Sequence, residues 1–586
     1  MKKNQRGTVR KVLKYIGRYR ILLAFSLFLA LASAVLMLLI PLLVGEAVDS
    51  MVEGRTGILE GVLPTLLWIG VLAGITAMLQ WLMNICNNRI TYGVVRDIRR
   101  DAFQKIQHLP LSYLDSHLTG DIVSRVVADA DALADGLLIG FTNLFTGVVT
   151  IAGTLLLMAF TNWAMMLPVA VLTPLSLFAA RFITSRTYGY FSTQSKDRGA
   201  QTAYLEEAVT GVRTLQAFGQ EENASRRFRD YNERLAKSSL KANFFSSLTN
   251  PTTRFVNNLV YAAVALVGGI FALPGFAFPL TAEFTVGKLT SFLAYANQYT
   301  KPFNEISGVV AELQNALACA DRLLELIEAE PEPSDEGAEA LGVAEGSVAL
   351  RDVAFSYVPE KPLIRDFSLS VHPGMRVAIV GPTGCGKTTL INLLMRFYDV
   401  KEGAIFVEGK DIRTLTRHSL RRNYGMVLQD TRLFAGTVKE NIVMGKRDAT
   451  EEQIVRAAKA AHAHSFIRRL PKGYDTVLSD GGEGLSAGQK QLLCIARVML
   501  TMPPMLILDE ATSSIDTRTE KKIRDAFNIL MEGKTTFIVA HRLSTVKEAD
   551  LILVMKDGNV IEQGTHASLL AQRGFYFDLY HSQFDV

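Results

Sequence analysis

The sequence predicts two domains of different fold class: an all-α domain of six helices, followed by an α/β domain. Two observations lead to this division. Long apolar runs recur through the first half, whereas the second half reads as an ordinary mixed α/β domain. The length of 586 residues also exceeds what a single hydrophobic core normally organises, so at least two domains are expected.

Six apolar segments form the first domain, and we interpret them as membrane spans. A span needs about 20 predominantly apolar residues to cross the hydrocarbon core. The first segment is too long for the apolar part of a signal peptide and lacks a convincing cleavage site, so we expect it to be retained. The last segment is the weakest candidate for a span, but its place after five others favours a span. The segments lie at about 21–44, 61–86, 138–160, 163–184, 255–279 and 287–310.

Basic residues predict the orientation of these spans, because Lys and Arg accumulate in cytoplasmic connections. Residues 1–20 are dense in Lys and Arg, and the connection at 46–61 is acidic. The basic connections at 87–137 and 185–254 carry apolar residues at helical spacing, so we expect the helices to continue into the cytoplasm. The chain is therefore predicted to be a multi-pass protein of the cell membrane, embedded in the lipid bilayer, with its N-terminus and second domain in the cytoplasm.

Each long connection contains a break in its helical pattern, at 114–121 and at 209–215. Short helices at these breaks that contact another domain are one interpretation, and simple turns between antiparallel helices are the other. Residues 329–346 are rich in Pro, Glu, Gly and Ala without periodicity, which indicates a linker. The predicted domains are therefore 1–328 and 347–586.

A phosphate-binding loop lies in the second domain, where GPTGCGKTT at 381–389 fits the P-loop pattern. An apolar strand precedes it and an apolar helix follows it, which is the order that a P-loop requires. Glycines let the backbone approach phosphate, Lys387 offers charge to the β- and γ-phosphates, and the Thr388 hydroxyl suits Mg²⁺. The residues expected to bind ATP in this loop are Gly381, Pro382, Thr383, Gly384, Cys385, Gly386, Lys387, Thr388 and Thr389.

Two further apolar strands end in polar residues. MLILDE ends in Asp509, which suits the Mg²⁺ shell, and in Glu510, which suits polarising a water for attack on the γ-phosphate. TTFIVAH ends in His541, and open α/β sheets bind ligands at the carboxyl ends of their strands. The second domain thus has the parts of a P-loop ATPase domain.

A second element suited to phosphate is GEGLSAGQKQLLCIARVML at 482–500, where small residues and a Ser precede an apolar helix. With LSAGQ at 485–489, the sequence resembles the ABC transporter family, whose signature motif is usually Leu-Ser-Gly-Gly-Gln. The P-loop, VLQD with Gln429, ILDEATSSID and AHRLST follow the family's order. Six spans with a fused ATPase domain match the exporter half-transporters, over essentially the whole chain.

The resemblance implies ATP-driven efflux of a hydrophobic or amphipathic substrate by alternating access, with Mg²⁺ as cofactor. In this family two ATPase domains stack head to tail, and each ATP lies between one subunit's P-loop and the other's signature. A second half-transporter subunit is therefore the expected partner. The resemblance also implies that the two breaks contain coupling helices, which dock on the ATPase domains.

The resemblance also implies roles for individual residues. Tyr357 would stack on adenine, Gln429 would contact Mg²⁺ and sense the membrane domain, and His541 would hold the γ-phosphate beside the catalytic Glu510. The residues that would hold an ATP bound to the partner's P-loop are Ser486, Ala487, Gly488, Gln489 and Asp516.

One position departs from the family pattern, because the third signature residue is Ala487 rather than Gly. A Cβ there would crowd the approach to phosphate or narrow the turn. An altered signature with an intact Glu510 is similar to one subunit of the heterodimeric bacterial multidrug exporters. Its sister chain would have a sound signature and lack the Walker B glutamate. We therefore expect a heterodimer, with a homodimer that tolerates Ala as the alternative.

The sequence says less about the substrate, and drugs, lipids and peptides all stay open. Polar side chains inside spans usually face the bundle interior, where interhelical hydrogen bonds explain them as well as a substrate cavity does. The candidates are Asn257, Asn258, Phe292, Tyr295, Asn297, Gln298 and Tyr299.

Two other classes of function compete with transport. A net charge of +5 gives no argument for nucleic-acid binding, and six spans argue against an ATPase that works on DNA, so no nucleic-acid partner is expected. The other class is an ATP-gated channel or regulatory subunit, which binds ATP without pumping. Gln429, Glu510 and His541 together favour ATP hydrolysis and so argue against this class. The scattered cysteines imply no disulfide framework.

Overall fold

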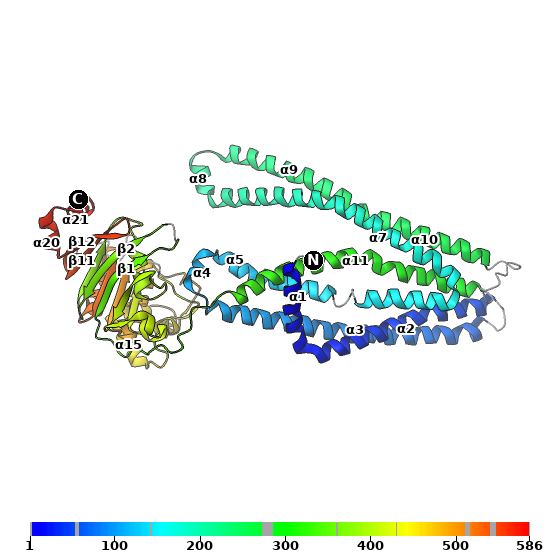
Figure 1. Cartoon of the computed structure of the whole chain (residues 1–586), viewed down its shortest axis with the longest axis horizontal. Coiled ribbons are helices and arrows are strands. Elements are labelled where there is room, and N and C mark those ends of the chain that lie inside the picture. The colour runs from blue at the N-terminus through cyan, green and yellow to red at the C-terminus, as the bar shows by residue number, and fades with distance from the viewer. Residues whose placement is uncertain are drawn as a thin grey trace. The chain divides into compact units, whose positions relative to one another are not determined.

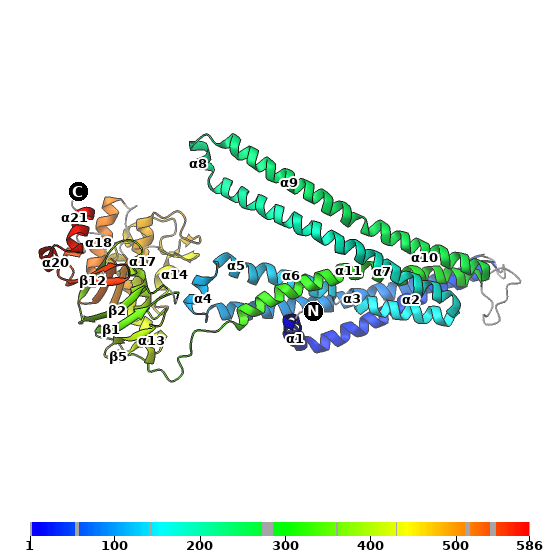
Figure 2. The ribbon, with the colours of Figure 1, turned by 45° about the horizontal axis from the view of Figure 1, so that its top comes forward.

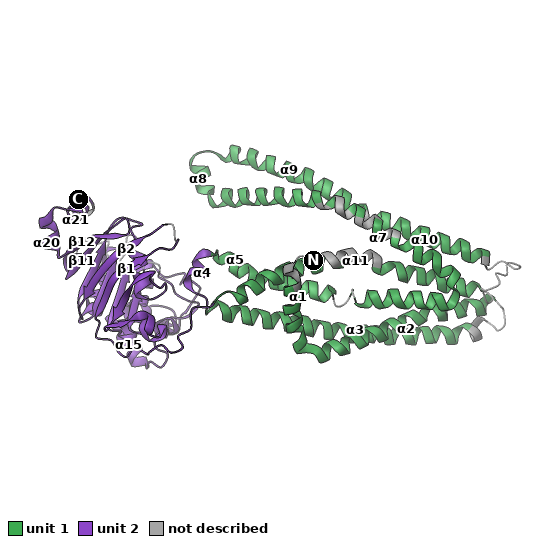
Figure 3. Cartoon of the chain, viewed as in Figure 1, with its two compact units in different colours: residues 1–108, 117–330 green, residues 109–116, 331–586 purple. Residues whose placement is uncertain are grey.

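The computed structural model describes residues 3–52, 58–140, 143, 145–271, 285–358, 361–428, 431–509, 516–539 and 546–584, without the side chains of some helical residues. The chain divides into two compact units (Figure 3). Unit 1 comprises residues 1–108 and 117–330, and unit 2 comprises residues 109–116 and 331–586. The division after residue 330 falls inside the segment predicted as a linker.

Unit 1 is helical throughout its described part (Figure 1). Helices suit a bilayer because they satisfy their own backbone hydrogen bonds. Four stretches are long and apolar enough to cross a membrane by length and composition: Gly7–Val52, Val62–Ile106, Phe145–Pro174 and Glu221–Ile270. The helices are α1 (Lys3–Ile16), η1 (Gly17–Tyr19), α2 (Arg20–Val52), α3 (Ile58–Ile106), α5 (Thr119–Ser124), η2 (Arg125–Asp129), α6 (Ala130–Ile139), α7 (Phe145–Thr210), α8 (Val212–Ala217), α9 (Glu221–Ser247), α10 (Thr249–Phe271) and α11 (Val286–Glu328).

The described parts of the six predicted spans fall on helices, although the helices do not match the spans one to one. α7 covers the third predicted span from residue 145 onward and the whole fourth predicted span. It is interrupted at Asn162, whose φ of −165° and ψ of 106° are extended. The Asn162 side-chain oxygen accepts hydrogen bonds from the N–H groups of Ala164 and Met165, at 3.0 and 3.2 Å. One residue thus ends a helix and caps the next. The sixth span lies in α11, outside the four stretches above, so the count of six stays a prediction.

α2 and α11 are in close contact around a proline in α2. Pro41 has no N–H, so the hydrogen-bond ladder of α2 is disturbed there. α11 supplies hydroxyl donors to this region: Ser291 Oγ donates to the Pro41 carbonyl at 2.7 Å, and the Tyr295 hydroxyl donates to the Leu38 carbonyl at 2.8 Å. A Cβ added to Gly287 would lie 2.0 Å from the Gly45 carbonyl oxygen, so both helices need glycine to approach this closely.

A short helix lies at each predicted break, which confirms both positions. At the first break, α4 (Leu111–Ser116) precedes α5. At the second, α8 joins the end of α7 to α9, and these two helices form an antiparallel arm with α8 at its tip (Figures 1 and 2). The arm is held by a stacked pair, Tyr204 and Tyr231, with ring centroids 5.3 Å apart.

Unit 2 is built on a six-stranded sheet in the order β12-β11-β3-β10-β9-β6, parallel except for β12. Successive residues of β3 point to opposite faces, so Ala378 and Val380 face one core and Val377 and Ile379 the other. The first core includes α14, α15, α17 and α18, and the second includes α12 and a four-stranded antiparallel sheet, β2-β1-β4-β5. The sheet is therefore buried on both faces, as parallel sheets are.

Strands and helices alternate along unit 2 after α4. In chain order they are β1 (Val348–Phe355), β2 (Ile364–Val371), β3 (Arg376–Val380), α12 (Lys387–Leu394), β4 (Glu402–Val407), β5 (Lys410–Asp411), η4 (Ile412–Thr414), α13 (Arg417–Arg422), β6 (Tyr424–Val427), β7 (Gly436–Thr437), α14 (Val438–Val443), α15 (Glu451–Ala460), α16 (His464–Ile467), η5 (Gly473–Asp475), β8 (Val477–Leu478), α17 (Ala487–Thr501), β9 (Met505–Asp509), α18 (Thr517–Met531), β10 (Thr535–Val539), β11 (Leu551–Lys556), β12 (Asn559–Gly564), α20 (His566–Gln572) and α21 (Phe575–Phe584).

The predicted linker is anchored on unit 2 through Arg417. This buried guanidinium lies 3.0 Å from a Glu332 carboxylate oxygen and 2.6 Å from one of Asp335. Farther along, Glu339 forms an isolated bridge with Leu415. Because the three contacts join this segment to α13 and the residues just before it, residues 331–346 act as a strap on unit 2 rather than as a free spacer.

We predict that Arg417→Met releases this strap. The change leaves the partly buried Asp335 carboxylate without this cation and removes one of the two guanidinium groups that bond Glu332, the other being Arg421 at 2.9 Å. This loss costs about 1–3 kcal/mol of local stability. Hydrogen exchange of peptides from 331–346, measured on the full-length protein, should become about tenfold faster or more. Arg422→Met, at an exposed position of the same helix, is the control. Equal exchange in both variants would show that Arg417 does not hold the strap.

Candidate functional site

The P-loop joins β3 to α12 and wraps around the ammonium of Lys387. Lys387 Nζ donates hydrogen bonds to the carbonyls of Gly381 and Pro382, at 2.8 and 2.9 Å. Gly381, Gly384 and Gly386 have φ values of +153°, +84° and +102°, which favour glycine. At Gly381 space also demands it, since a Cβ would lie 2.2 Å from the Met555 carbonyl oxygen. The loop therefore holds a positive charge at a helix start, which fits a triphosphate.

The predicted loop residues differ in exposure, and so in what their side chains can do. Pro382, Thr383 and Thr388 are exposed. Cys385 is only 3% exposed and its thiol lies in the core under the loop, so its side chain cannot reach a phosphate from this position. Thr389 is buried as well, and its hydroxyl accepts a hydrogen bond from Tyr357 at 3.2 Å.

Tyr357 lies beside the P-loop helix with much of its ring exposed. Its hydroxyl also accepts a hydrogen bond from Asn392 Nδ2 at 3.3 Å. Its ring packs edge-on against Phe355 and Tyr398, with centroids 4.9 and 5.0 Å away. Because 47% of the residue is exposed, a ring face is available to an adenine base.

The strands that precede the other predicted catalytic residues end at one edge of the sheet. β9 ends at Asp509, which pairs in register with Val539 at the end of β10, and Val539 pairs with Ile379 of β3 beside the P-loop. β6, on the other side of β9, ends at Val427. The next residues in the chain carry the predicted catalytic groups, Glu510, His541 and Gln429, which lie outside the described residues.

The protein itself offers few ligands for Mg²⁺. The Thr388 hydroxyl is exposed at the start of α12, and Asp509, 9% exposed, ends β9. No group of three or more His, Cys, Asp or Glu side chains able to hold a metal occurs in the described parts of the chain. This donor set fits Mg²⁺, which is usually bound through one or two protein groups together with substrate phosphates and water.

The signature residues form the capped start of α17. Ser486 is the N-cap: its Oγ accepts from the Gln489 N–H at 3.3 Å, and the Ser486 N–H donates to Gln489 Oε1 at 2.9 Å. Ala487 is the first helical residue and is exposed, whereas Gly488 is buried. The N–H groups of the first helical turn have no acceptor inside the helix, so this end suits an anion.

Asp516 caps α18 in the same manner. Its carboxylate accepts a hydrogen bond from the Thr519 N–H at 2.9 Å. This backbone donor lowers the pKa of Asp516 below its ordinary value, so the carboxylate is ionised at neutral pH. The exposed side chain caps its own helix here, and a role across a subunit interface stays a prediction.

α4, at the first predicted break, belongs to unit 2 although it lies between two helices of unit 1 in the chain. The Tyr398 hydroxyl donates a hydrogen bond to Asp115 of α4. Burial, and then this hydrogen bond, raise the pKa of Tyr398, so the phenol keeps the proton that it donates. Tyr398 also packs on Tyr357, so one aromatic cluster connects α4 with the P-loop region.

The candidate substrate residues separate into three groups. Phe292, Tyr295 and Tyr299 are at most 4% exposed and pack in a core with residues of α2, α7 and α10, so the structure places them between helices and not at a cavity. Asn258 and Asn297 are exposed, and Asn257 is half-buried. Gln298 lines a cavity of about 320 Å³ in unit 1.

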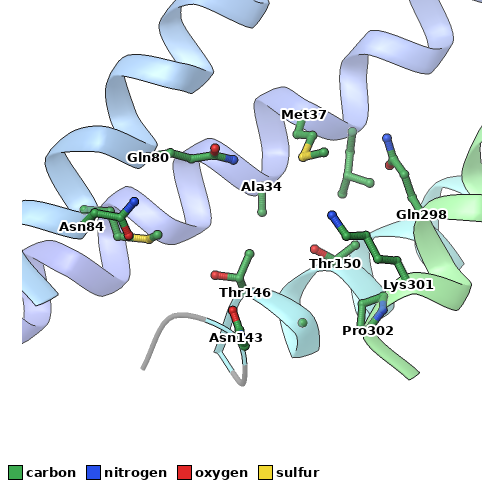
Figure 4. Close-up of a pocket in the computed structure, with 13 residues that line it drawn as sticks. Ala34, Met37, Gln80, Asn84, Asn143, Thr146, Thr150, Gln298, Lys301 and Pro302 are labelled. Carbon is green, nitrogen blue, oxygen red and sulfur yellow. The ribbon is translucent and has the colours of Figure 1, made fainter. Parts of the chain in front are cut away.

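This cavity also contains a lysine that the sequence analysis did not single out. Lys301 extends from α11 into the cavity, toward α2 and α3 (Figure 4). A basic residue in an apolar segment is a signal that was present in the sequence, because charges inside spans are rare and mark functional sites. The other lining residues are Ala34, Met37, Leu38, Gln80, Met83, Asn84, Asn143, Thr146, Gly147, Thr150 and Pro302.

The fold and the site define a membrane protein with a fused P-loop ATPase domain. The ABC transporter transmembrane region matches residues 23–303, and the ABC transporter family matches residues 364–513. The chain belongs to the ABC transporters, as an exporter half-transporter, and it hydrolyses ATP to drive transport.

Similar proteins match over nearly the whole chain. The uncharacterized ABC transporter ATP-binding protein YfiC of Bacillus subtilis is 38% identical, over 100% of this chain and 95% of the relative. A fatty acid ABC transporter ATP-binding/permease protein of Mycobacterium bovis is 42% identical over 86% of this chain and 78% of its own. An ATP-dependent lipid A-core flippase of Syntrophus aciditrophicus is 35% identical over 84% of this chain and 80% of the relative. The structure of a bacterial Atm1-family ABC exporter with ATP bound matches with a TM-score of 0.79 and 28% identity. The match covers 97% of this chain and 98% of the exporter chain.

We predict that Tyr357→Ala raises the Kd for ATP by about tenfold or more, the usual range for losing an aromatic ring stacked on a base. Equilibrium binding of radiolabelled ATP to the full-length protein measures this. Tyr357→Phe keeps the ring and removes only the hydroxyl that bonds Thr389, so it should bind ATP nearly as the unmodified protein does. Equal affinities in all three proteins would remove Tyr357 from the adenine site.

Proposed function

We propose that this half-transporter moves a hydrophobic or amphipathic, lipid-like substrate across the cell membrane by alternating access, as one half of a dimer. The observation that carries the proposal is that unit 2 has two separate elements suited to phosphate, the P-loop and the exposed start of α17. A single nucleotide held by one chain has no use for both. The relatives whose names specify a fatty acid or a lipid A-core substrate support the lipid class.

ATP would be held first by the P-loop of one subunit. Lys387 turns from the loop carbonyls to the β- and γ-phosphates, Tyr357 stacks on adenine, and Thr388 with Asp509 holds the Mg²⁺ that the phosphates bring, with Gln429 near them. The start of α17 from the partner subunit then closes on the γ-phosphate through Ser486 and the N–H groups at 487 and 488. Glu510 orients and polarises the attacking water, and His541 contacts the γ-phosphate. Once that phosphate leaves, the P-loop of one subunit and the start of α17 of the other separate.

Two short helices would carry this motion to the membrane-spanning helices. α4 is held on unit 2 by the Tyr398–Asp115 hydrogen bond, so a movement of the P-loop region reaches α4 directly. α8 presents apolar side chains at the tip of its arm, with Val212 44% and Phe218 74% exposed. Exposed apolar side chains on a polar arm fit a docking contact with an ATPase unit. The basic N-terminus supports a cytoplasmic position for that unit.

The partner is proposed to be a sister chain with a sound signature and no Walker B glutamate. The pair would then have one strong hydrolytic site, formed by the P-loop and Glu510 of this chain and the signature of the sister chain. A homodimer is the second candidate, and one observation favours it. Ala487 occupies the first helical position with its side chain exposed, and the Ser486–Gln489 capping box is intact, so the alanine does not distort α17. The two candidates differ in whether this chain alone can hydrolyse ATP.

Glu510→Gln is predicted to lower ATP turnover by ~10²–10⁴, the usual effect of losing a general base, while ATP binding and closure of the dimer persist. Phosphate release measures the turnover, and cross-linking across the dimer measures the closure. Glu532→Gln, at an exposed site after α18, is the charge-matched control. Unchanged hydrolysis in Glu510→Gln would exclude Glu510 from the mechanism.

For the chain purified without any sister subunit, we predict slow ATP turnover that rises at least about tenfold on co-expression with a half-transporter that has a sound signature. The physical reason is that Ala487 narrows the approach to the partner's γ-phosphate. Ala487→Gly in the lone chain should recover part of that rate. Brisk turnover by the lone chain, unchanged in Ala487→Gly, would establish the homodimer.

A further inference from the structure

The cavity in unit 1 combines one cation with a wall of uncharged polar groups. α2, α3, α7 and α11 contribute the lining, and Lys301 is its one charged member. Figure 4 shows the Lys301 side chain reaching toward the middle of the space, with Thr150 close by on α7 and Gln80 facing it from α3. No carboxylate is among the described residues that line the cavity, so none of them neutralises this positive charge.

Lys301 makes no hydrogen bond or ion pair with any residue in the part of the chain that the structure describes. Lys301 itself is exposed. Thr146 Oγ1 and Gln298 Oε1, two other polar atoms of the cavity, are buried without a hydrogen-bond partner among the described residues. Buried polar groups in folded proteins are normally paired, and each exception requires an explanation. By contrast, Ser291 and Tyr295 on the same helix are both bonded to α2. Thr91 Oγ1 and Asn257 Oδ1, outside the cavity lining, also lack a partner among the described residues, but only in the cavity do two such atoms lie together with a lysine.

The backbone and the apolar side chains shape the other side of this cavity. Pro302, directly after Lys301, cannot donate a backbone hydrogen bond within α11. α7 comes close at Gly147, where a Cβ would lie 3.3 Å from Pro302 Cβ. The apolar lining comes from Ala34, Met37 and Leu38 of α2 and from Met83 of α3. The cavity thus has a cationic polar side and an apolar side.

We propose that this cavity binds the headgroup of an anionic amphiphile, a carboxylate or phosphate attached to an apolar chain, with Lys301 as the group that selects the anion. The ammonium pairs with the headgroup, Thr150 and Gln80 bond its remaining oxygens, and the first part of the chain lies on Met37 and Met83. At about 320 Å³ the cavity lies at the lower end of the range of ligand pockets, so the rest of the chain extends beyond it.

This inference rests on the proposed export of a lipid-like substrate and narrows it to anions. Direct binding tests it without requiring turnover. The full-length transporter, with its partner if one is obligatory, is placed in nanodiscs of phosphatidylcholine, which has no net charge. The Kd values for radiolabelled oleate and for oleyl alcohol, which has the same chain without the charge, are then compared.

The unmodified protein should bind oleate about ten- to a hundredfold more tightly than oleyl alcohol, as expected for a charge-assisted hydrogen bond. Lys301→Gln should lose that preference and leave the affinity for oleyl alcohol nearly unchanged, and Lys301→Arg should retain it. Lys288→Gln, on the same helix but outside the cavity lining, is the matched control. If Lys301→Gln does not fold, Lys301→Met removes the same charge with a linear side chain.

Competition identifies the source of the anion. Displacement of oleate by lysophosphatidate supports a phosphate headgroup, and failure of that displacement supports a carboxylate. Displacement by acetate or inorganic phosphate alone would overturn the amphiphile part of the proposal. Equal oleate affinity in Lys301→Gln and the unmodified protein would overturn the role of Lys301. Tight binding of oleyl alcohol with no preference for oleate would exclude the anion while leaving lipid export in place, whereas a protein that binds neither probe and transports no amphiphile would contradict the proposed function itself.

Discussion

Hydrogen bonding of a triphosphate by backbone N–H groups is the interaction on which the architecture of unit 2 depends. At the P-loop, Gly381 must be glycine because the Met555 carbonyl leaves no room for a Cβ, and the loop then closes around the Lys387 ammonium. Parallel strands bring their carboxyl ends to the same edge, so Asp509, Val427 and Val539 lie there although they come from distant parts of the chain. A second helix start, at Ser486, carries the same chemistry on a separate element. The sheet positions one face of the nucleotide site, and in the proposed dimer a second copy of the fold would supply the other.

In unit 1 the controlling constraint is that polar groups in hydrocarbon need partners. The chain meets it at Pro41, where the hydroxyls of Ser291 and Tyr295 bond α2 carbonyls across the helix contact. Around Lys301 two polar atoms, Thr146 Oγ1 and Gln298 Oε1, lack partners among the described residues, as do Thr91 Oγ1 and Asn257 Oδ1 outside the cavity. Polar residues that bond a neighbouring helix are thus distinct from unbonded ones, and the proposal assigns the unbonded pair in the cavity to a ligand. Tyr295 and Gln298 are three positions apart on one helix and fall on opposite sides of this division.

Local chemistry decides what could be predicted from the sequence. The P-loop, the capped start of α17 and both breaks follow from residues close together in the chain, and they lie where the motifs place them. The strap could not be predicted, because its anchor joins Asp335 to Arg417, and no local pattern records such a pairing. The turn at Asn162 depends on one side chain bonding two N–H groups just after it, which hydrophobic periodicity does not detect. The aromatic residues 292, 295 and 299 were candidates for a cavity, since composition cannot tell a side chain packed between helices from one that lines a pocket.

In the proposed dimer, the methyl group of Ala487 would act on the pair of subunits without acting on its own chain. In α17 it is the first helical residue, where alanine is well tolerated, and the capping box formed by Ser486 and Gln489 is undisturbed. The helix dipole and the free N–H groups of the first turn are therefore the same as they would be with glycine. What changes is the exposed surface, because the methyl group occupies space on the side from which a partner's γ-phosphate would approach. In the proposed dimer, an alteration of this kind would leave folding and ATP binding at the chain's own P-loop untouched and would weaken only the site that the partner's P-loop completes. Its effect would therefore belong to the pair of subunits and not to either one.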